Sequence, residues 1–109
     1  MPPEDRVRLL HMIEAAEDAM SFVAGKERTE LEQDRKTLFA VIRCIEIIGE
    51  AATRISETTR TAAPDIPWSA IVGMRNRLVH AYFDVDTDVV WKTTTIELPA
   101  LRSQLLALV

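Results

Sequence analysis

The chain has 109 residues, the length of one domain, and we expect residues 1–109 to form a single domain. Its 13 basic and 17 acidic residues give a net charge of −4, which argues against capture of nucleic acid by the whole molecule and requires any RNA surface to be local. One cysteine, Cys44, excludes an internal disulfide and a cysteine-based zinc site.

The first residues carry acids where a signal peptide has its basic start, and no run approaches the roughly 18 apolar residues of a membrane span. We therefore expect a cytoplasmic protein without membrane contact.

Helical spacing dominates the N-terminal half. A first helix is predicted from about Glu4 to Val23, with Gly25 as its stop, because glycine enters the left-handed conformation without steric cost. Its apolar positions recur at steps of three and four: Val7, Leu10, Ile13, Ala16, Met20 and Val23. His11, on this helix, has no acid or cysteine arranged for metal binding, and we expect it to be exposed without a role.

A second helix is predicted to begin with a capping box of Thr29 and Glu32. Nearly thirty residues at 1.5 Å each give roughly 40 Å, which is longer than a domain of this size needs and indicates pairing with a second copy. Its apolar stripe consists of Leu31, Leu38, Val41, Ile45, Ile48, Ala52 and Ile55.

Residues 58–66 read as a connector, and Pro67 suits the first turn of a third helix from Trp68 to about Val79. Asp86 or Thr87 is expected to cap a fourth helix. Pro99 either kinks this helix or starts a fifth. The prediction is an all-α bundle of four or five helices with no sheet.

The stretch between Ile66 and Phe83 has no acidic residue but contains Arg75, Arg77 and His80, which predicts a local positive surface. On an ideal helix Arg75 and His80 are about 140° apart, so they converge only if the helix ends or distorts, or if a second chain completes the site.

A histidine beside arginines suits cleavage of RNA without a metal or another cofactor. Histidine can accept the proton of a 2′-hydroxyl or donate one to the leaving 5′-oxygen, and arginine can clamp the phosphate. The sequence has no carboxylate trio for two metals and no Gly-rich phosphate loop. The plainer alternative is that these cations form a solvated helix end that complements the helix dipole.

The pattern RxxxxHxY falls on Arg75, His80 and Tyr82, after IEIIGEAA at residues 45–52 and DIPW at residues 65–68. In this context the chain resembles the HepT-like branch of the HEPN superfamily. The resemblance implies a homodimeric all-α HEPN-type bundle whose paired motifs line a cleft between protomers. It implies a metal-independent endoribonuclease, the toxin of a type VII-like toxin–antitoxin system, whose MntA-like nucleotidyltransferase antitoxin transfers AMP to the motif tyrosine.

Carried onto this sequence, the resemblance makes Arg75 and His80 catalytic and Tyr82 the AMP acceptor, with Asn76 and Arg77 in support. Such nucleases often carry an acid that orients the histidine. Of the two candidates, Glu46 and Glu50, the second lies inside the IGEAA match and is preferred, although both also fit a solvated helix face. The alternative function is a non-catalytic subunit that presents substrate or nucleotide to a nucleotidyltransferase.

Overall fold

The computed structural model of the protein describes residues 1–81 and 84–109, with the side chains of residues 80 and 81 outside the description. Most of these residues are helical, and the predicted all-α class is confirmed. In chain order the elements are α1 (Pro3–Val23), α2 (Arg28–Gln33), α3 (Arg35–Thr53), α4 (Glu57–Ala62), α5 (Trp68–Val72), α6 (Met74–Leu78), β1 (Val79–Ala81), β2 (Asp84–Val85), α7 (Thr87–Lys92), the π-helical η1 (Thr93–Glu97) and α8 (Leu98–Leu108).

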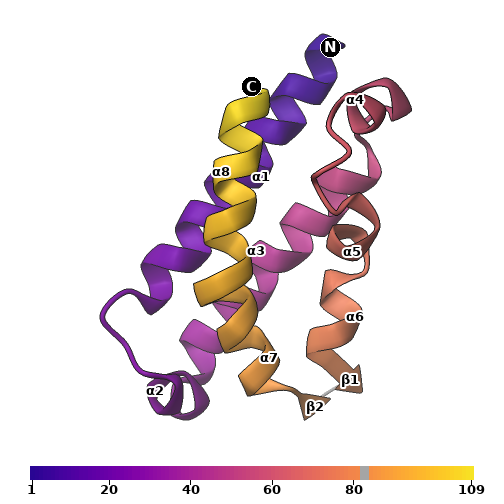
Figure 1. Cartoon of the computed structure of the whole chain (residues 1–109). Helices are drawn as coiled ribbons and strands as arrows, with labels where there is room; N and C mark the ends of the chain where they lie inside the picture. The colour runs from indigo at the N-terminus through magenta and orange to yellow at the C-terminus, as the bar shows by residue number, and fades with distance from the viewer. Residues whose placement is uncertain (82–83) are drawn as a thin grey trace.

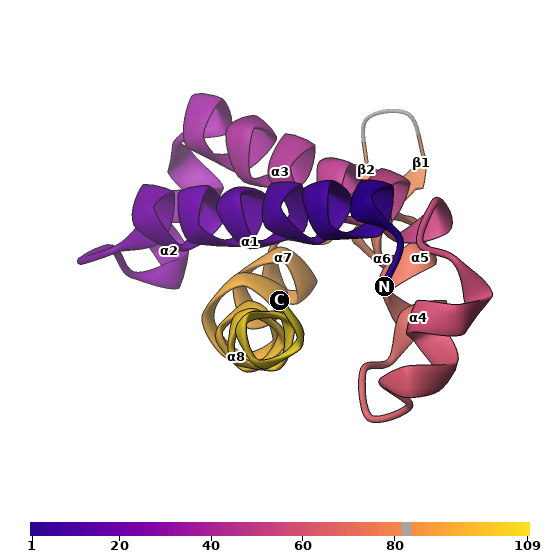
Figure 2. The same ribbon diagram turned by 90° about the horizontal axis from the view of Figure 1, so that it is seen from above.

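Helices α1 and α3 lie antiparallel, side by side, and form one layer of the molecule (Figures 1 and 2). Helix α8 packs against α1 from one side of this layer, and α5 and α6 pack against α3. The buried apolar side chains form one connected cluster between these elements. No helix in the described part of the chain is long and apolar enough to cross a membrane.

The bounds of α1 and its glycine stop agree with the prediction: Gly25 has a φ of 75°. The predicted apolar face of this helix is partly wrong, because Val7 and Leu10 are 52% and 40% exposed, whereas Leu9 and Met12 are fully buried. The cause is that α1 packs against both α3 and α8, so its buried face is wider than one stripe and is turned from the predicted centre.

The predicted long second helix is broken into α2 and α3 at Asp34. The Asp34 side chain accepts hydrogen bonds from the backbone N–H and the hydroxyl of Thr37, at 3.1 and 2.6 Å, and so caps a new helix. The expected capping box does not form, since α2 begins after Glu27 without a side-chain cap. The 19 residues of α3 span about 28 Å, so its length no longer argues for dimerisation. The predicted stripe is nonetheless buried from Leu31 to Ile55.

The predicted connector holds a short helix, α4, whose N-terminus is capped by the hydroxyl of Ser56. The predicted third helix is interrupted at Gly73, between α5 and α6, and ends at Leu78. Inside α3, a Cβ atom on Gly49 would lie 3.3 Å from the backbone oxygen of Ile71. The absence of a side chain there lets α5 approach α3 closely, which sets the position of α6.

The prediction of no sheet is wrong at one place, where β1 and β2 form a small antiparallel pair after α6. Strands of three and two residues are too short to show an alternating pattern in the sequence. Asp86 caps α7, as predicted, by accepting from the N–H of Val89 at 3.1 Å. Helix α7 runs through η1 into α8, and Pro99 lies in the first turn of α8, so the chain keeps its helical course there.

Candidate active site

Arg75 lies on α6 and meets a carboxylate of α3. Its Nε donates a hydrogen bond to Oε2 of Glu46 at 2.9 Å, and the two side chains are 52% and 28% exposed. No other hydrogen bond of the Arg75 side chain is found among the described residues. A contact through Nε fixes the plane of the guanidinium group and leaves its two terminal nitrogens to meet a phosphate.

Arg75 and its neighbour Asn76 line a cleft of about 790 Å³ between α1, α3 and the α5–α6 segment. Its volume is within the range of about 300–1,000 Å³ that is usual for ligand sites. The wall contributed by α1 includes Val7 and His11, and the opposite wall includes Val72. The described lining residues are Glu4, Val7, Arg8, His11, Ile45, Glu46, Ile47, Gly49, Glu50, Ala51, Thr53, Arg54, Val72, Arg75 and Asn76.

The end of α6 separates Arg75 from His80. The helix stops at Leu78, and His80 follows two residues later in β1. A helix end was one of the ways in which the two residues could converge. Because α6 ends before His80, the backbone does not hold the two residues about 140° apart, as an ideal helix would. The side chain of His80 and the whole of Tyr82 lie outside the described residues, so their predicted roles stay predictions.

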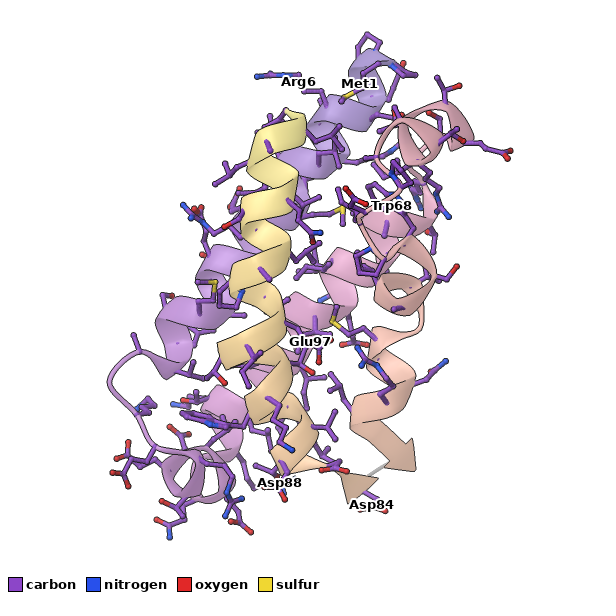
Figure 3. The ribbon with its side chains drawn as sticks, viewed as in Figure 1. Met1, Arg6, Trp68, Asp84, Asp88 and Glu97 are labelled. Carbon is purple, nitrogen blue, oxygen red and sulfur yellow. The ribbon has the colours of Figure 1, made fainter. Side chains whose placement is uncertain are left out.

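Arg77 contacts a different segment of the chain. Its Nη2 lies 3.2 Å from Oε1 of Glu97, at the end of η1, and Arg77 is not among the described residues that line the cleft. Figure 3 shows Glu97 on the side of its helix that faces α6. The positive surface predicted from the local sequence is therefore largely neutralised, because Arg75 and Arg77 each meet a carboxylate from a distant segment.

Glu50, the preferred helper of His80, lines the cleft and forms an ion pair with Arg43 at 3.3 Å. Its neighbour Glu46 is the acid that contacts Arg75. Sequence reasoning did not assign this contact, although helical spacing places the two acids on one face of α3. Which acid reaches His80 remains a prediction.

Trp68, Cys44 and His11 are the remaining residues of chemical interest. Trp68 is 7% exposed, and its indole N–H donates to the carbonyl of Ala63 at 3.1 Å, so it is a core anchor. Cys44 is buried, and burial raises the pKa of its thiol. His11 is exposed, but it lines the cleft, which the sequence alone did not indicate. Among the described residues no three His, Cys, Asp or Glu side chains are grouped to hold a metal ion.

A family model described as "Ribonuclease HepT-like" matches residues 12–108, almost the whole chain. The chain belongs to the ribonuclease HepT-like family. This confirms the predicted HepT-like family of the HEPN superfamily and the predicted class of enzyme, an RNA nuclease.

Several curated proteins are similar to this HepT-like chain. A protein of Methanocaldococcus jannaschii named "Putative RNase" is 35% identical over 105 residues, which cover 95% of this chain and 87% of that protein. A "Probable ribonuclease HepT" of Thermococcus cleftensis is 48% identical over 71 residues, or 65% of this chain and 64% of that protein. A "Putative RNase" of Caldanaerobacter subterraneus is 33% identical and covers 91% of this chain and 88% of its own length. No solved structure matches the chain.

Proposed function

We propose that this HepT-like protein is the toxin of a type VII-like toxin–antitoxin system, a metal-independent endoribonuclease that uses Arg75 and His80 on RNA. Its AMP-modified form, with the nucleotide on Tyr82, is the silent state. The observation that supports the catalytic pair best is the end of α6 at Leu78, because it frees His80 from the helical geometry that would hold it away from Arg75.

The proposed reaction is an internal displacement at a phosphodiester. A base removes the proton of the 2′-hydroxyl, and the 2′-oxygen attacks phosphorus while the bond from phosphorus to the 5′-oxygen breaks. An acid gives a proton to that 5′-oxygen, so the products are a 2′,3′-cyclic phosphate and a 5′-hydroxyl. Arg75 would stabilise the negative charge that grows on the non-bridging oxygens.

The test is cleavage of total RNA by unmodified protein in excess EDTA. We expect wild type to cut and His80→Ala and Arg75→Ala to be at least 100-fold slower, since a positioned proton-transfer group or charge stabiliser contributes that much. Arg102→Ala is the matched control, because Arg102 also donates through Nε to a glutamate, Glu17, at 2.7 Å on another surface. If wild type is inactive although its intact mass shows that it is unmodified, the alternative is favoured, in which the protein is a non-catalytic subunit that presents substrate or nucleotide to a nucleotidyltransferase.

We propose the nucleotidyltransferase antitoxin as the partner that modifies Tyr82. In that step the phenol oxygen attacks the α-phosphorus of ATP, the bond to the β-phosphate oxygen breaks, and pyrophosphate leaves with the phenolic proton passing to a base. The adduct places bulk and negative charge near the RNA phosphate. Tyr82 is the one tyrosine of the chain, so any tyrosine adduct is on it. Tyr82→Phe should gain no AMP mass, and an adduct retained by that variant would contradict the assignment.

We also propose that the protein is a homodimer in which the paired motifs line a cleft between the protomers. Val7 and Val72, which are 52% and 40% exposed, line the cleft, and a second copy of the chain could bury both. We expect sedimentation to report a dimer and Val72→Glu to give a monomer, because a charge there would have to be desolvated in the interface. Ile96→Glu is the control, since Ile96 is 66% exposed outside the cleft. A wild-type monomer at micromolar concentration would contradict the dimer.

Glu50 is retained in this proposal as the acid that orients His80, while Glu46 holds Arg75. The two roles are separable by experiment. Glu50→Gln should weaken cleavage through the histidine and leave phosphate binding unchanged, whereas Glu46→Gln should loosen Arg75 and weaken RNA binding as well. Equal effects of both variants on binding and on turnover would contradict the division.

A further inference from the structure

The cleft has an arginine toward each end of the wall that α3 provides. Arg75 contacts Glu46, and Arg54 follows Glu46 by eight residues, so at 1.5 Å per residue the two places are about 12 Å apart along the helix. Arg54 is the residue at which α3 ends, and it lines the cleft with an exposed side chain. The end of the cleft that lies away from Arg75 therefore carries a cation of its own.

The backbone of Arg54 is held in place, but its side chain is not engaged. Its carbonyl oxygen accepts a hydrogen bond from Nη1 of Arg8 at 2.9 Å, which joins the end of α3 to α1. No hydrogen bond, ion pair or ring contact of the Arg54 side chain is found among the described residues. A guanidinium group without a protein partner keeps its N–H donors for an oxyanion.

The charges near Arg54 leave it available to an anion. Glu50 lies one turn before it on α3, at the spacing of an ion pair, but Glu50 contacts Arg43 instead, at 3.3 Å. Glu4 and Arg8 are the charged residues that α1 contributes to the lining, and their charges oppose one another. The positive charge of Arg54 is therefore not cancelled by a contact within the described part of the chain.

The surface is also hollow beyond Arg54. A second cavity of about 520 Å³ shares Thr53 with the first, and its lining residues are Thr53, Ile55, Glu57, Arg60 and Thr61. A strand that places one phosphate at Arg75 thus has room to continue past the end of α3.

We propose that Arg54 binds a second phosphate of the RNA strand, two nucleotides along from the phosphate at Arg75; this rests on the proposed function. The separation of about 12 Å along α3 is close to the distance between a phosphate and the next but one in an extended single strand. Arg54 does not touch the reacting atoms, so its role is to hold the strand along the cleft. In the proposed homodimer each protomer supplies its own Arg75 and Arg54 to the strand that it binds.

The first test measures binding to RNA that cannot be cut. The probe is a random-sequence single strand with 2′-O-methyl groups, which keeps its phosphates but lacks the hydroxyl that attacks phosphorus. We expect Arg54→Gln to reduce the slope of log affinity against log salt concentration by about 0.7, the contribution of one phosphate contact on a single strand. Arg6→Gln is the matched control, because Arg6 is also exposed but is not among the described residues that line the cleft, and Figure 3 shows it on the side of α1 away from α4.

The second test uses cleavage of total RNA in excess EDTA. Arg54→Gln should raise KM by about 3- to 5-fold and affect KM more than kcat, because it removes binding energy away from the reacting atoms. Arg75→Ala should act mainly on kcat. A cation at the end of a helix can also stabilise the helix dipole, and that role alone would lower the melting temperature of Arg54→Gln without changing the salt slope or KM.

Each outcome decides the assignment of Arg54. A reduced salt slope together with a raised KM supports it, whereas an unchanged slope, or an equal change in Arg6→Gln, overturns it. If wild type cuts RNA and Arg54→Gln does so with the same KM, only this inference fails. If wild type binds the probe through Arg54 but cuts no RNA, the proposed function fails while the phosphate contact stands. If wild type neither binds nor cuts, both fail.

Discussion

The carboxylate of Asp5 is 1% exposed and joins the first turn of α1 to the start of α4. It accepts hydrogen bonds from the backbone N–H of Ser56 at 3.2 Å, from the Ser56 hydroxyl at 2.5 Å and from the Thr59 hydroxyl at 2.6 Å, while Arg8 lies 3.8 Å away. Removal of the carboxylate leaves these three donors without their acceptor in a buried place. We predict that Asp5→Ala is strongly destabilising.

The size of the effect follows from the three bonds. A hydrogen bond to a charged group contributes about 1.5–3 kcal/mol to the free energy of unfolding. The two hydroxyls can turn to other acceptors in the variant, so the loss is smaller than the sum of three such contributions. We expect Asp5→Ala to lower the free energy of unfolding by about 3 kcal/mol and Asp5→Asn by about half of that, since Asn keeps one oxygen acceptor. At roughly 4–8 °C per kcal/mol for a domain of this size, the melting temperature of Asp5→Ala falls by about 12–24 °C.

The loss should also depend on pH. Burial raises the pKa of Asp5, but the hydrogen bonds from Ser56 and Thr59 and the charge of Arg8 outweigh it, so the pKa in the folded protein is below its ordinary value of 3.8. A lowered pKa gives stability that is present above the unfolded pKa and is lost as the pH falls through the folded pKa. Wild type and Asp5→Asn should therefore differ most at pH 7 and converge below pH 3.8.

Urea unfolding followed by circular dichroism measures both effects. Glu4→Gln is the control on the same turn, because Glu4 is exposed, and we expect it to stay within about 0.5 kcal/mol of wild type. Unfolding of Asp5→Ala at the wild-type urea concentration would contradict the stabilising role of this carboxylate. So would a difference in stability between wild type and Asp5→Asn that is the same in acid as at neutral pH.

Three further changes test the elements that place the site. Asp34→Ala should lower the melting temperature, because the N-cap bond to Thr37 is lost; an unchanged value would contradict the capping role. Gly49→Val should cost about 1–3 kcal/mol in urea unfolding, since its side chain meets the α5 backbone. Gly73→Ala should not, because its Cβ would lie at an ordinary contact distance of 3.7 Å from the Ser69 carbonyl oxygen. Arg60→Ala should cost about 1–3 kcal/mol, because Arg60 bonds two backbone carbonyls at the end of α3; equal stability would show that water replaces it.

The sequence predicts the fold best where burial is strongest. Every residue of the predicted stripe from Leu31 to Ile55 is buried, because a helix against a core needs apolar residues at this spacing. The same stripe conceals the break at Asp34: its members Leu31 and Leu38 are seven apart, a step that fits one helix or two. A continuous stripe would have an apolar residue at position 34 or 35, between Leu31 and Leu38. Its absence was the signal in the sequence that the helix breaks there.

The candidate site is less predictable, because its contacts join segments that are distant in the sequence. Convergence of Arg75 and His80 needed a helix end, a distortion or a second chain, and the third helix, predicted to about Val79, ends at Leu78. The partner of Arg75 was not foreseeable, since the choice of Glu46 over Glu50 depends on where α5 and α6 cross α3. The place of His11 in the cleft likewise follows from the packing of α1 on α3.

The contact between Arg75 and Glu46 joins residues 29 positions apart, and the wall of the cleft that carries His11 comes from the beginning of the chain. This arrangement exists only after α1, α3 and α6 have packed together, so a chain still emerging from the ribosome has no assembled site. The cleft and the contact of Arg75 therefore depend on the completion of folding, after the last residues of α6 have been made.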